Sequence, residues 1–230
     1  MPLSPDSAPR RGFLARAGAS LAALVSLPSA ASATPASATG WKEPKVTTTY
    51  DESWLRELRA PVRQAFDISS HADGQAWGFL RRFLNGWTEG WGIKPAEVQA
   101  VAILHGSATE FAFNDAIWAK YKVGDALKLT DPATRAPALR NAWYAGDPEH
   151  GLALEDAMQQ LQARGTIILV CHNATKRVAG RSARASGIDP AEVLADYERN
   201  LAPGCRIVPA AVSAISRAQH HGCTYVKGVG

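Results

Sequence analysis

The chain has few cysteines and no hydrophobic run long enough to cross a membrane. Only three cysteines occur among its 230 residues, Cys171, Cys205 and Cys223. A disulfide-dense small domain is therefore excluded, and the odd number leaves at least one thiol unpaired within the chain. The apolar stretch near the N-terminus, about residues 17–27, falls far short of the roughly 20 residues that a transmembrane helix needs. We expect no membrane span.

An excess of charge of one sign is also lacking. The formal net charge is +4, and because three arginines and one aspartate lie in the first 33 residues, the rest of the chain carries only +2. No basic stripe interleaved with aromatic side chains is present, which argues against nucleic acid as a partner. With 46% hydrophobic and 20% charged residues, the chain has the composition of an ordinary globular domain.

The N-terminal segment has the organisation of an export signal. Arg10 and Arg11 precede Gly-Phe-Leu, a short apolar stretch follows, and an Ala-Ser-Ala sequence like a signal-peptidase site ends it. This arrangement resembles a twin-arginine signal peptide, so we expect residues 1–33 to direct export to the bacterial periplasm. Residues 34–51, rich in Thr, Pro and Ala, are predicted to form a flexible N-terminal arm, and residues 52–230 a single domain.

Short apolar segments alternate with helix-like patterns through that domain. We predict strands at 62–68, 98–106, 166–170, 205–208 and 223–226. We predict helices at 73–91, 107–122, 147–165, 173–184, 189–201 and 209–220. Such alternation is typical of an open, mostly parallel sheet with helices on both faces. The predicted fold class is therefore α/β, with a flavodoxin-like five-stranded sheet.

Three of the connecting segments carry expectations of their own. The stripe formed by Trp77, Leu80, Leu84, Trp87 and Trp91 has helical spacing and indicates a core-facing helix surface. Residues 123–146 are rich in Gly, Pro, Asp and Asn, which favours a long loop of the kind that is usually functional or mobile. In the last helix, Val212 and Ile215 are expected to point inward.

Chemically active side chains stand where two of the predicted strands end. His105 ends the second strand, and Cys171 and His172 end the third. In an open α/β sheet, ligands and catalytic groups collect at the carboxyl edge of parallel strands, particularly where the strand order reverses. We therefore expect His105 and the Cys171-His172 pair to share one water-accessible edge.

The residues after Cys171 suit a reactive thiol. A thiolate is stabilised at a helix N-terminus and beside cations, and a predicted helix carrying Lys176 and Arg177 follows Cys171. His105 or His172 would act as a general base or as a metal ligand. Asn173 is expected to cap the helix. Cys171, His105 and His172 are thus the candidate catalytic residues, and Asn173 and Lys176 are candidate cofactor-binding residues.

Structural interpretations stand beside these functional ones. A cysteine at the end of a buried strand often serves as a small hydrophobic side chain, and a single histidine such as His105 is often a structural residue. Cys205 and Cys223 either lie in the core or form a disulfide, if their Cα atoms approach within about 7 Å.

A metal site remains an alternative. His105, Cys171, His172 and Asp115 would hold a metal ion or small cofactor inserted before export. Zinc sites, however, usually show three or four ligands at regular spacing, which this sequence does not display, so we assign no metal ligands.

Taken together, five segments resemble the DsrE/DsrF-like family, in its branch with twin-arginine signals. They are "AILHGSA", "NDAIWAKYKVGD", "LQARGTIILVCHNATKR", a Gly-Ile-Asp-Pro helix start and "LAPGCRIVPAAVSAISRAQHHGCTYVKG". The resemblance extends over residues 62–227, nearly the whole domain. Its most specific parts are the strand-Cys-x-Asn segment and the C-terminal succession of Val-Pro, helix, Gln, Gly and Tyr.

The resemblance implies a flavodoxin-like fold, assembly into homo-oligomers and a role in sulfur relay. Members of the family hold sulfur as a persulfide on a cysteine that follows a central strand, and Cys171 matches that position. A sulfur-transfer or redox protein would then be the partner. The resemblance assigns no role to Cys205 or Cys223. The leading hypothesis is a sulfur carrier or thiol redox protein, and the alternative is a non-catalytic oligomer that binds a metal or small cofactor.

Overall fold

A single open sheet of five parallel strands forms the centre of the domain. The computed structural model describes residues 45–228 of the chain. The strands are β1 (Val62–Ile68), β2 (Val98–Leu104), β3 (Ile167–Cys171), β4 (Cys205–Val208) and β5 (Thr224–Lys227). All neighbouring strands run parallel. The predicted α/β, flavodoxin-like fold class is confirmed, and all five predicted strands are present.

The order of strands across the sheet is β4-β3-β2-β1-β5. The first four strands follow one another in one direction, and the fifth returns to pair with the free side of β1. Flavodoxin itself has the order 2-1-3-4-5, so the two share layers but not strand order. Every residue of β3 is buried, because a central parallel strand is covered on both faces.

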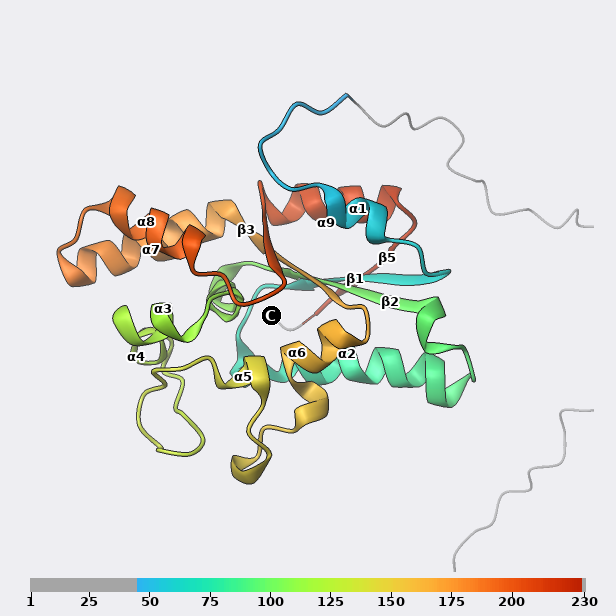
Figure 1. Ribbon diagram of the computed structural model, residues 1–230, viewed down its shortest axis with the longest axis horizontal. Helices are drawn as coiled ribbons and strands as arrows, with labels where there is room; N and C mark the ends of the chain where they lie inside the picture. Colours follow the sequence, from blue (N-terminus) through green and yellow to red (C-terminus); the bar gives the residue numbers. More distant parts are fainter. Residues whose placement is uncertain (1–44, 229–230) are drawn as a thin grey trace, which may run out of the picture. The chain divides into compact units, whose positions relative to one another are not determined.

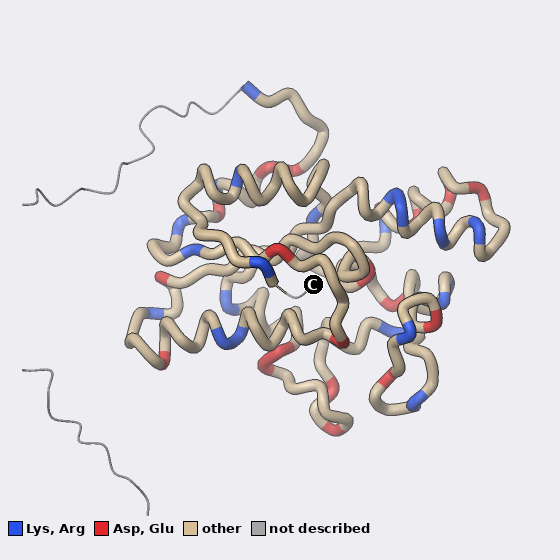
Figure 2. Tube along the Cα trace, turned by 180° about the vertical axis from the view of Figure 1, so that it is seen from behind, with Lys and Arg blue, Asp and Glu red and all other residues tan. Residues whose placement is uncertain are grey.

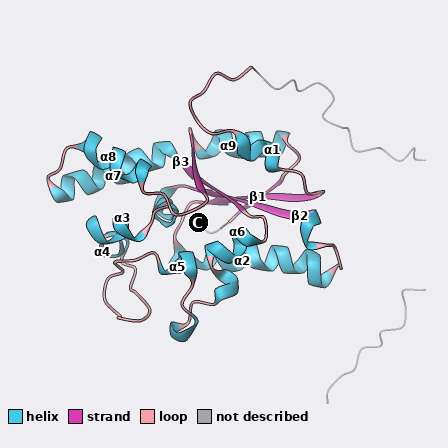
Figure 3. Ribbon diagram, viewed as in Figure 1, coloured by secondary structure: helices cyan, strands magenta, loops and turns pink. Residues whose placement is uncertain are grey.

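Helices pack on both faces of the sheet, with the strands between them (Figures 1 and 3). One face carries α1 (Ser53–Glu57) and α9 (Ala211–His220), which form the smaller of two hydrophobic cores. The larger core lies on the other face and includes residues of α2 (Gln75–Asn85), α6 (Met158–Ala163), α7 (His172–Ser186) and α8 (Pro190–Arg199). Side chains of β2 alternate between the two cores, as strand geometry requires.

The tryptophan-rich segment forms α2, followed by a π-helical turn at Gly86–Gly90. Trp77, Leu80 and Leu84 are buried as predicted, but Trp91 is 69% exposed. The prediction for Trp91 is wrong because the π-helical turn changes the helical phase after Asn85. Trp91 packs instead on Trp87, with the ring centroids 4.7 Å apart.

The segment between β2 and β3 contains shorter helices than the sequence predicts. They are three 3-10 helices, Gly106–Ala112, Pro148–His150 and Leu154–Asp156, and the α-helices α3 (Asp115–Lys120), α4 (Val123–Leu127), α5 (Ala142–Ala145) and α6. The predicted helix 107–122 is interrupted before α3, which Asn114 caps by accepting the backbone N–H of Ala116. The predicted loop 123–146 thus contains two short helices.

The structure corrects two expectations: the length of the helix predicted from Asp147 and the inward direction of Val212. A helix does begin after Asp147 as predicted, with Asp147 at the N-cap position and Pro148 first, but it is a single 3-10 turn, Pro148–His150, and α6 begins only at Met158. The carboxylate of Asp147 binds Arg140 and His150 and makes no capping hydrogen bond. Val212 is 74% exposed, since α9 faces the smaller core with alanines that permit close packing. Ile215 does pack against that core. Asp189 caps α8 as predicted, accepting the N–H of Ala191 at 2.8 Å.

The N-terminal predictions fall largely beyond what the structure describes. The export signal, residues 1–33, lies outside the described residues, as does the first part of the arm at 34–51. Residues 45–51 of that arm form no helix or strand. Within residues 45–228, no helix combines the length and the apolar character needed to cross a bilayer.

Candidate functional site

His105 and Cys171 stand next to each other at the carboxyl edge of the sheet. Strand register pairs Leu104 with Val170, so the next residue on each strand, His105 and Cys171, lies at the same level. Adjacent strands are about 4.8 Å apart. Cys171 belongs to the smaller core while Leu104 belongs to the larger one, and alternation therefore directs His105 toward the same face as Cys171.

At the position of Cys171, the connections that follow two neighbouring strands leave on opposite faces of the sheet. Cys171 and Val208 are paired residues at the ends of β3 and β4. From these neighbouring ends the chain continues into α7, in the larger core, and into α9, in the smaller core. A crevice between strands whose connections leave on opposite faces is where open α/β sheets bind ligands.

Two helices begin beside the Cys171 position. Cys171 is the N-cap residue of α7, although its sulfur accepts no capping hydrogen bond. Ala210, two residues after Val208, is the N-cap of α9 and offers no side-chain cap. Amides in the first turn of a helix favour negative charge nearby. The residue itself is only 6% exposed, so a reagent would have to be small to reach the thiol.

A carboxylate and a phenol hold His105. The Nε2 atom of His105 lies 2.6 Å from Oδ1 of Asp67 on β1, and the hydroxyl of Tyr225 on β5 donates to Oδ2 of Asp67 at 3.0 Å. The side chains of His105 and Asp67 are 30% and 18% exposed. Gly106 follows at φ +58°, and a Cβ there would lie 2.1 Å from the carbonyl oxygen of Ser69. Only glycine allows this close turn after His105.

His172 is held by a second, separate set of side chains. Its Nε2 lies 2.6 Å from Oε1 of Glu198 on α8, and its Nδ1 lies 2.6 Å from the hydroxyl of Tyr50 in the arm. These residues line a pocket of about 500 Å³ together with Asp51, Arg206 and Ile207. The two imidazoles therefore bind different partners, and the expected convergence of both with Cys171 on one cleft stays a prediction.

The other candidate residues after Cys171, Asn173 and Lys176, lie in the first turns of α7. Asn173 does not cap α7, because the helix begins one residue earlier and Cys171 occupies the cap position. Lys176 and Arg177 are exposed, and Figure 2 shows α7 carrying several cations along its length. Neither Asn173 nor Lys176 has a side-chain bond to the Cys171 or His105 side chains, so their proposed contact with a cofactor stays a prediction.

Cys205 and Cys223 do not pair. β4 and β5 form opposite edges of the sheet, which places Cys205 and Cys223 several strands apart, well beyond the roughly 7 Å that a disulfide spans. All three cysteines are free thiols. Burial raises the pKa of Cys205 to about 12 and that of Cys223 to about 11. Both behave as core residues.

The metal-binding alternative would need a cluster of ligand side chains. Among residues 45–228, no group of three or more His, Cys, Asp or Glu side chains is arranged to hold a metal ion. Asp115 belongs to no such group, and its carboxylate accepts the backbone N–H of Asn141 at 2.7 Å.

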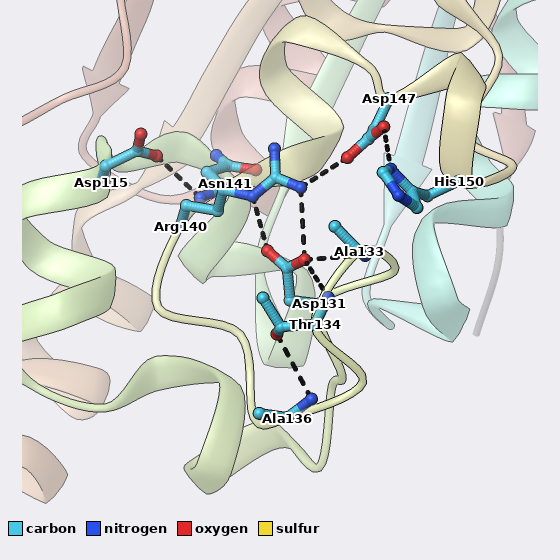
Figure 4. Close-up of polar contacts among 9 residues, drawn as sticks. All are labelled: Asp115, Asp131, Ala133, Thr134, Ala136, Arg140, Asn141, Asp147 and His150. Atoms are coloured by element: carbon cyan, nitrogen blue, oxygen red, sulfur yellow. Dashed lines mark hydrogen bonds and ion pairs between the residues drawn. The ribbon is translucent and has the colours of Figure 1, made fainter.

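An ionic network, here called the Arg140 network, holds the segment between α4 and α6 (Figure 4). Arg140 donates to Asp131 and to Asp147, each at 2.5 Å, and His150 Nδ1 lies 2.8 Å from Asp147. Asp131 also accepts the N–H groups of Ala133 and Thr134 at 2.9 and 3.2 Å. Hydrogen bonds from Arg140 lower the pKa of both aspartates. This segment, predicted to be functional or mobile, is therefore fastened by charged side chains.

A buried glutamate lies in the 3-10 helix that follows His105. The side chain of Glu110 is 1% exposed and is paired with Arg181 of α7. Its Oε2 atom has no hydrogen-bond partner. Burial is the main cause that raises the pKa of Glu110, to about 7, against the opposing effect of Arg181. The carboxylate of Glu110 thus binds α7, and within residues 45–228 it forms no hydrogen bond or ion pair with His105 or Cys171.

Sequence reasoning missed four residues that the structure brings to the two histidines: Asp67, Tyr225, Tyr50 and Glu198. One signal for Asp67 was present, since an acidic residue stands near the end of the otherwise apolar stretch Ala-Phe-Asp-Ile. Tyr50 and Glu198 lie 122 and 26 residues from His172, and no local pattern relates them.

No protein-family model matches the chain, and no curated protein sequence matches it at a significant level.

Proposed function

We propose that this chain is an exported DsrE/DsrF-like protein that uses Cys171 as a thiol nucleophile, to carry sulfane sulfur as a persulfide or to perform thiol redox chemistry. One observation supports this most: Cys171 stands at the switch point of the sheet, level with His105, whose ring is held by Asp67. A nucleophile beside an oriented base is the arrangement that nucleophilic catalysis uses.

The chemistry of a sulfur carrier at this position is redox-neutral. Cys171 loses its proton to a neighbouring imidazole, and the thiolate attacks the outer sulfur of a persulfide or polysulfide donor. A bond forms between Cys171 sulfur and that atom, the donor's sulfur–sulfur bond breaks, and the departing thiolate (from a persulfide) or shorter polysulfide anion (from a polysulfide) takes up a proton. The 6% exposure of Cys171 favours a small donor such as inorganic polysulfide.

Mass spectrometry of the folded protein after exposure to polysulfide tests the proposal. We expect a gain of about 32 Da per sulfur atom on the peptide that contains Cys171. The double variant Cys205→Ser/Cys223→Ser is the matched control and should gain the same mass, because those thiols are buried with raised pKa values. An unmodified Cys171 peptide, or equal gain in Cys171→Ser, contradicts the function.

A redox role is separable from sulfur carriage by the product formed. A carrier releases its sulfane sulfur to cyanide or a thiol and returns to the free thiol, whereas a redox protein forms a mixed disulfide on Cys171. Treating the polysulfide-exposed protein with cyanide should therefore yield thiocyanate if Cys171 carries sulfur. Recovery of a mixed disulfide without thiocyanate would favour the redox role.

Export and self-association are part of the same proposal. The paired Arg10 and Arg11 with the following apolar stretch support export through a twin-arginine signal. Replacing both arginines with lysine should leave an unprocessed precursor inside the cell, and the processed protein should begin at Thr34. Light scattering of the processed protein checks the expected homo-oligomer.

A further inference from the structure

Asp67, His105 and Cys171 form a row across three adjacent strands. Asp67 is on β1, His105 follows β2 and Cys171 ends β3, and β2 lies between the other two. The three residues face the same side of the sheet, the side of the smaller core, by strand alternation and by the 2.6 Å contact between Asp67 and His105. The row thus has the order carboxylate, imidazole, thiol.

The contact with Asp67 determines which nitrogen of His105 carries the proton. A carboxylate only accepts hydrogen bonds, so the Nε2 atom that faces Asp67 must be the donor. Tyr225 donates to the other oxygen of the same carboxylate, and this hydrogen bond raises the pKa of Tyr225, so the phenol stays a donor. In the neutral ring, Nδ1 is consequently left with a lone pair.

That Nδ1 atom is available to accept a proton. No side chain or backbone group in the described part of the chain hydrogen-bonds to Nδ1 of His105, and the sulfur of Cys171 on the next strand likewise has no hydrogen-bond partner there. His172 differs, because Glu198 engages its Nε2 and the hydroxyl of Tyr50 engages its Nδ1. Of the two histidines beside Cys171, His105 is therefore the one with an unoccupied acceptor nitrogen.

We infer that Asp67 is a positioning residue that fixes His105 in the Nε2–H tautomer and thereby makes its Nδ1 the base for the Cys171 thiol. The inference rests on the proposed function of Cys171 and adds to it a division of labour between the two histidines. His105 moves the proton, and His172 fastens the arm to α8.

The proton balance is complete within these groups. The thiol proton of Cys171 passes to Nδ1, giving an imidazolium whose Nε2–H remains bonded to Asp67. When the Cys171 thiolate takes the outer sulfur of a polysulfide, the donor's sulfur–sulfur bond breaks, and the leaving polysulfide anion, one sulfur atom shorter, takes the proton from Nδ1 and restores the neutral ring. The thiol and the ring are not hydrogen-bonded to each other, and catalytic contacts of this kind commonly close only with substrate bound. Lys227 on β5 is paired in register with Asp67, so one cation lies next to this row of residues.

The first test reads the tautomer directly and needs no change at Asp67. In ¹⁵N-labelled Cys171→Ser protein, long-range ¹H–¹⁵N spectra at neutral pH should show His105 protonated on Nε2 and unprotonated on Nδ1. Observation of the Nδ1–H tautomer overturns the inference. This result does not depend on whether Cys171 is reactive, so it separates a failure of the inference from a failure of the proposed function.

The second test follows the pH profile of Cys171 alkylation with a small reagent. An amide at position 67 donates to Nε2 and so favours the Nδ1–H tautomer. Asp67→Asn should lower the alkylation rate at pH 6.5 by about tenfold or more and shift the profile to higher pH. The matched control Asp147→Asn removes a carboxylate–histidine contact elsewhere, at His150, and should leave the profile unchanged.

Each outcome decides a different question. A folded Asp67→Asn protein with the wild-type profile overturns the inference and leaves the proposed function standing. Wild-type Cys171 that resists alkylation contradicts the proposed function, while the tautomer measurement still decides the role of Asp67. If Asp67→Asn fails to fold, the tautomer of His105 in the otherwise unchanged protein remains the deciding measurement.

Discussion

Two carboxylate–histidine contacts in this domain have different surroundings. At the carboxyl edge, Asp67 binds Nε2 of His105, and the other ring nitrogen has no partner in the described chain. In the Arg140 network, Asp147 binds Nδ1 of His150 at 2.8 Å, and Arg140 joins Asp147 to Asp131. The second contact belongs to a charged cluster on an irregular segment, whereas the first stands at the end of a central strand beside a thiol.

The difference indicates what each contact does. Around Arg140, opposite charges satisfy one another, and the free energy of those contacts maintains a segment that has little helix or strand of its own. Beside His105, an acceptor nitrogen and a thiol both lack partners in the described residues, which is typical of sites that react. The comparison predicts that substitutions at the edge change reactivity and substitutions in the network change stability.

The largest effect is expected from His105→Gln. Because a positioned base contributes about 100-fold or more to proton transfer, alkylation of Cys171 near pH 7 should slow by about that factor. His150→Gln is the matched control and should change the rate by less than about twofold. Alkylation rates measured by mass spectrometry check both variants. Equal alkylation rates in His105→Gln and wild type would show that His105 does not act on the Cys171 thiol.

A third carboxylate, that of Glu110, differs from both because only one of its oxygens is paired. The pKa of Glu110 rises to about 7 in the folded protein, so between about pH 4.5 and 7 the unfolded chain loses this proton and the folded chain retains it. Stability should therefore fall as pH rises through that window, by about 2 to 3 kcal/mol. In Glu110→Gln, urea unfolding should lose this slope. Glu192→Gln, at an exposed site, should retain it.

Arg140→Ala should lower the free energy of unfolding without slowing the alkylation of Cys171. Asp131, whose side chain is 6% exposed, would keep its charge without its partner, at a cost of about 2 kcal/mol after allowance for the partly exposed arginine. The lowered pKa values of Asp131 and Asp147 mean that this contribution is present above about pH 4 and is lost as pH falls through their folded pKa values. Urea unfolding at neutral and acid pH measures it, with Arg184→Ala as control. An Arg140→Ala variant that keeps wild-type stability but shows slow alkylation of Cys171 would contradict both expectations.

The smallest effect is expected from Tyr50→Phe. Loss of the hydroxyl bonded to His172 at 2.6 Å should cost about 1 kcal/mol and loosen residues 45–51. Hydrogen exchange in the arm should rise, while Tyr144→Phe, whose hydroxyl makes no such bond, should leave the arm unchanged. Protection of the arm equal to wild type would show that His172 does not fasten it.

The strands and their parallel arrangement were predictable from the sequence. Each strand is a short apolar run with turn residues around it, and this local pattern needs no partner to be recognised. The segment between β2 and β3 was not predictable in the same way. Asp147 followed by proline has the pattern of a helix start, and a 3-10 turn does begin there, but it ends at His150 and α6 begins only at Met158. Arg140 and His150 bind the carboxylate of Asp147, and a competing side-chain contact is invisible in a local pattern.

At the candidate site, the sequence predicted that Cys171 and His105 would share an edge, and the register confirms it. It did not predict that Asp67 and Tyr225 would hold His105, nor that Tyr50 and Glu198 would hold His172. These partners come from other strands, a distant helix and the arm. The roles of Cys171, His105 and His172 stay predictions that the variants above examine.

By itself, the amino-acid sequence determined the α/β layers and the residues that stand at strand ends, because hydrophobic periodicity and turn residues act over a few neighbours along the chain. Only the tertiary structure decided which histidine has an unoccupied nitrogen and which is fully bonded. That outcome depends on β5 returning to β1, so that Tyr225 reaches Asp67, and on α8 and the arm meeting at His172. Such contacts join residues far apart in sequence, and the folded chain alone brings them within hydrogen-bonding distance.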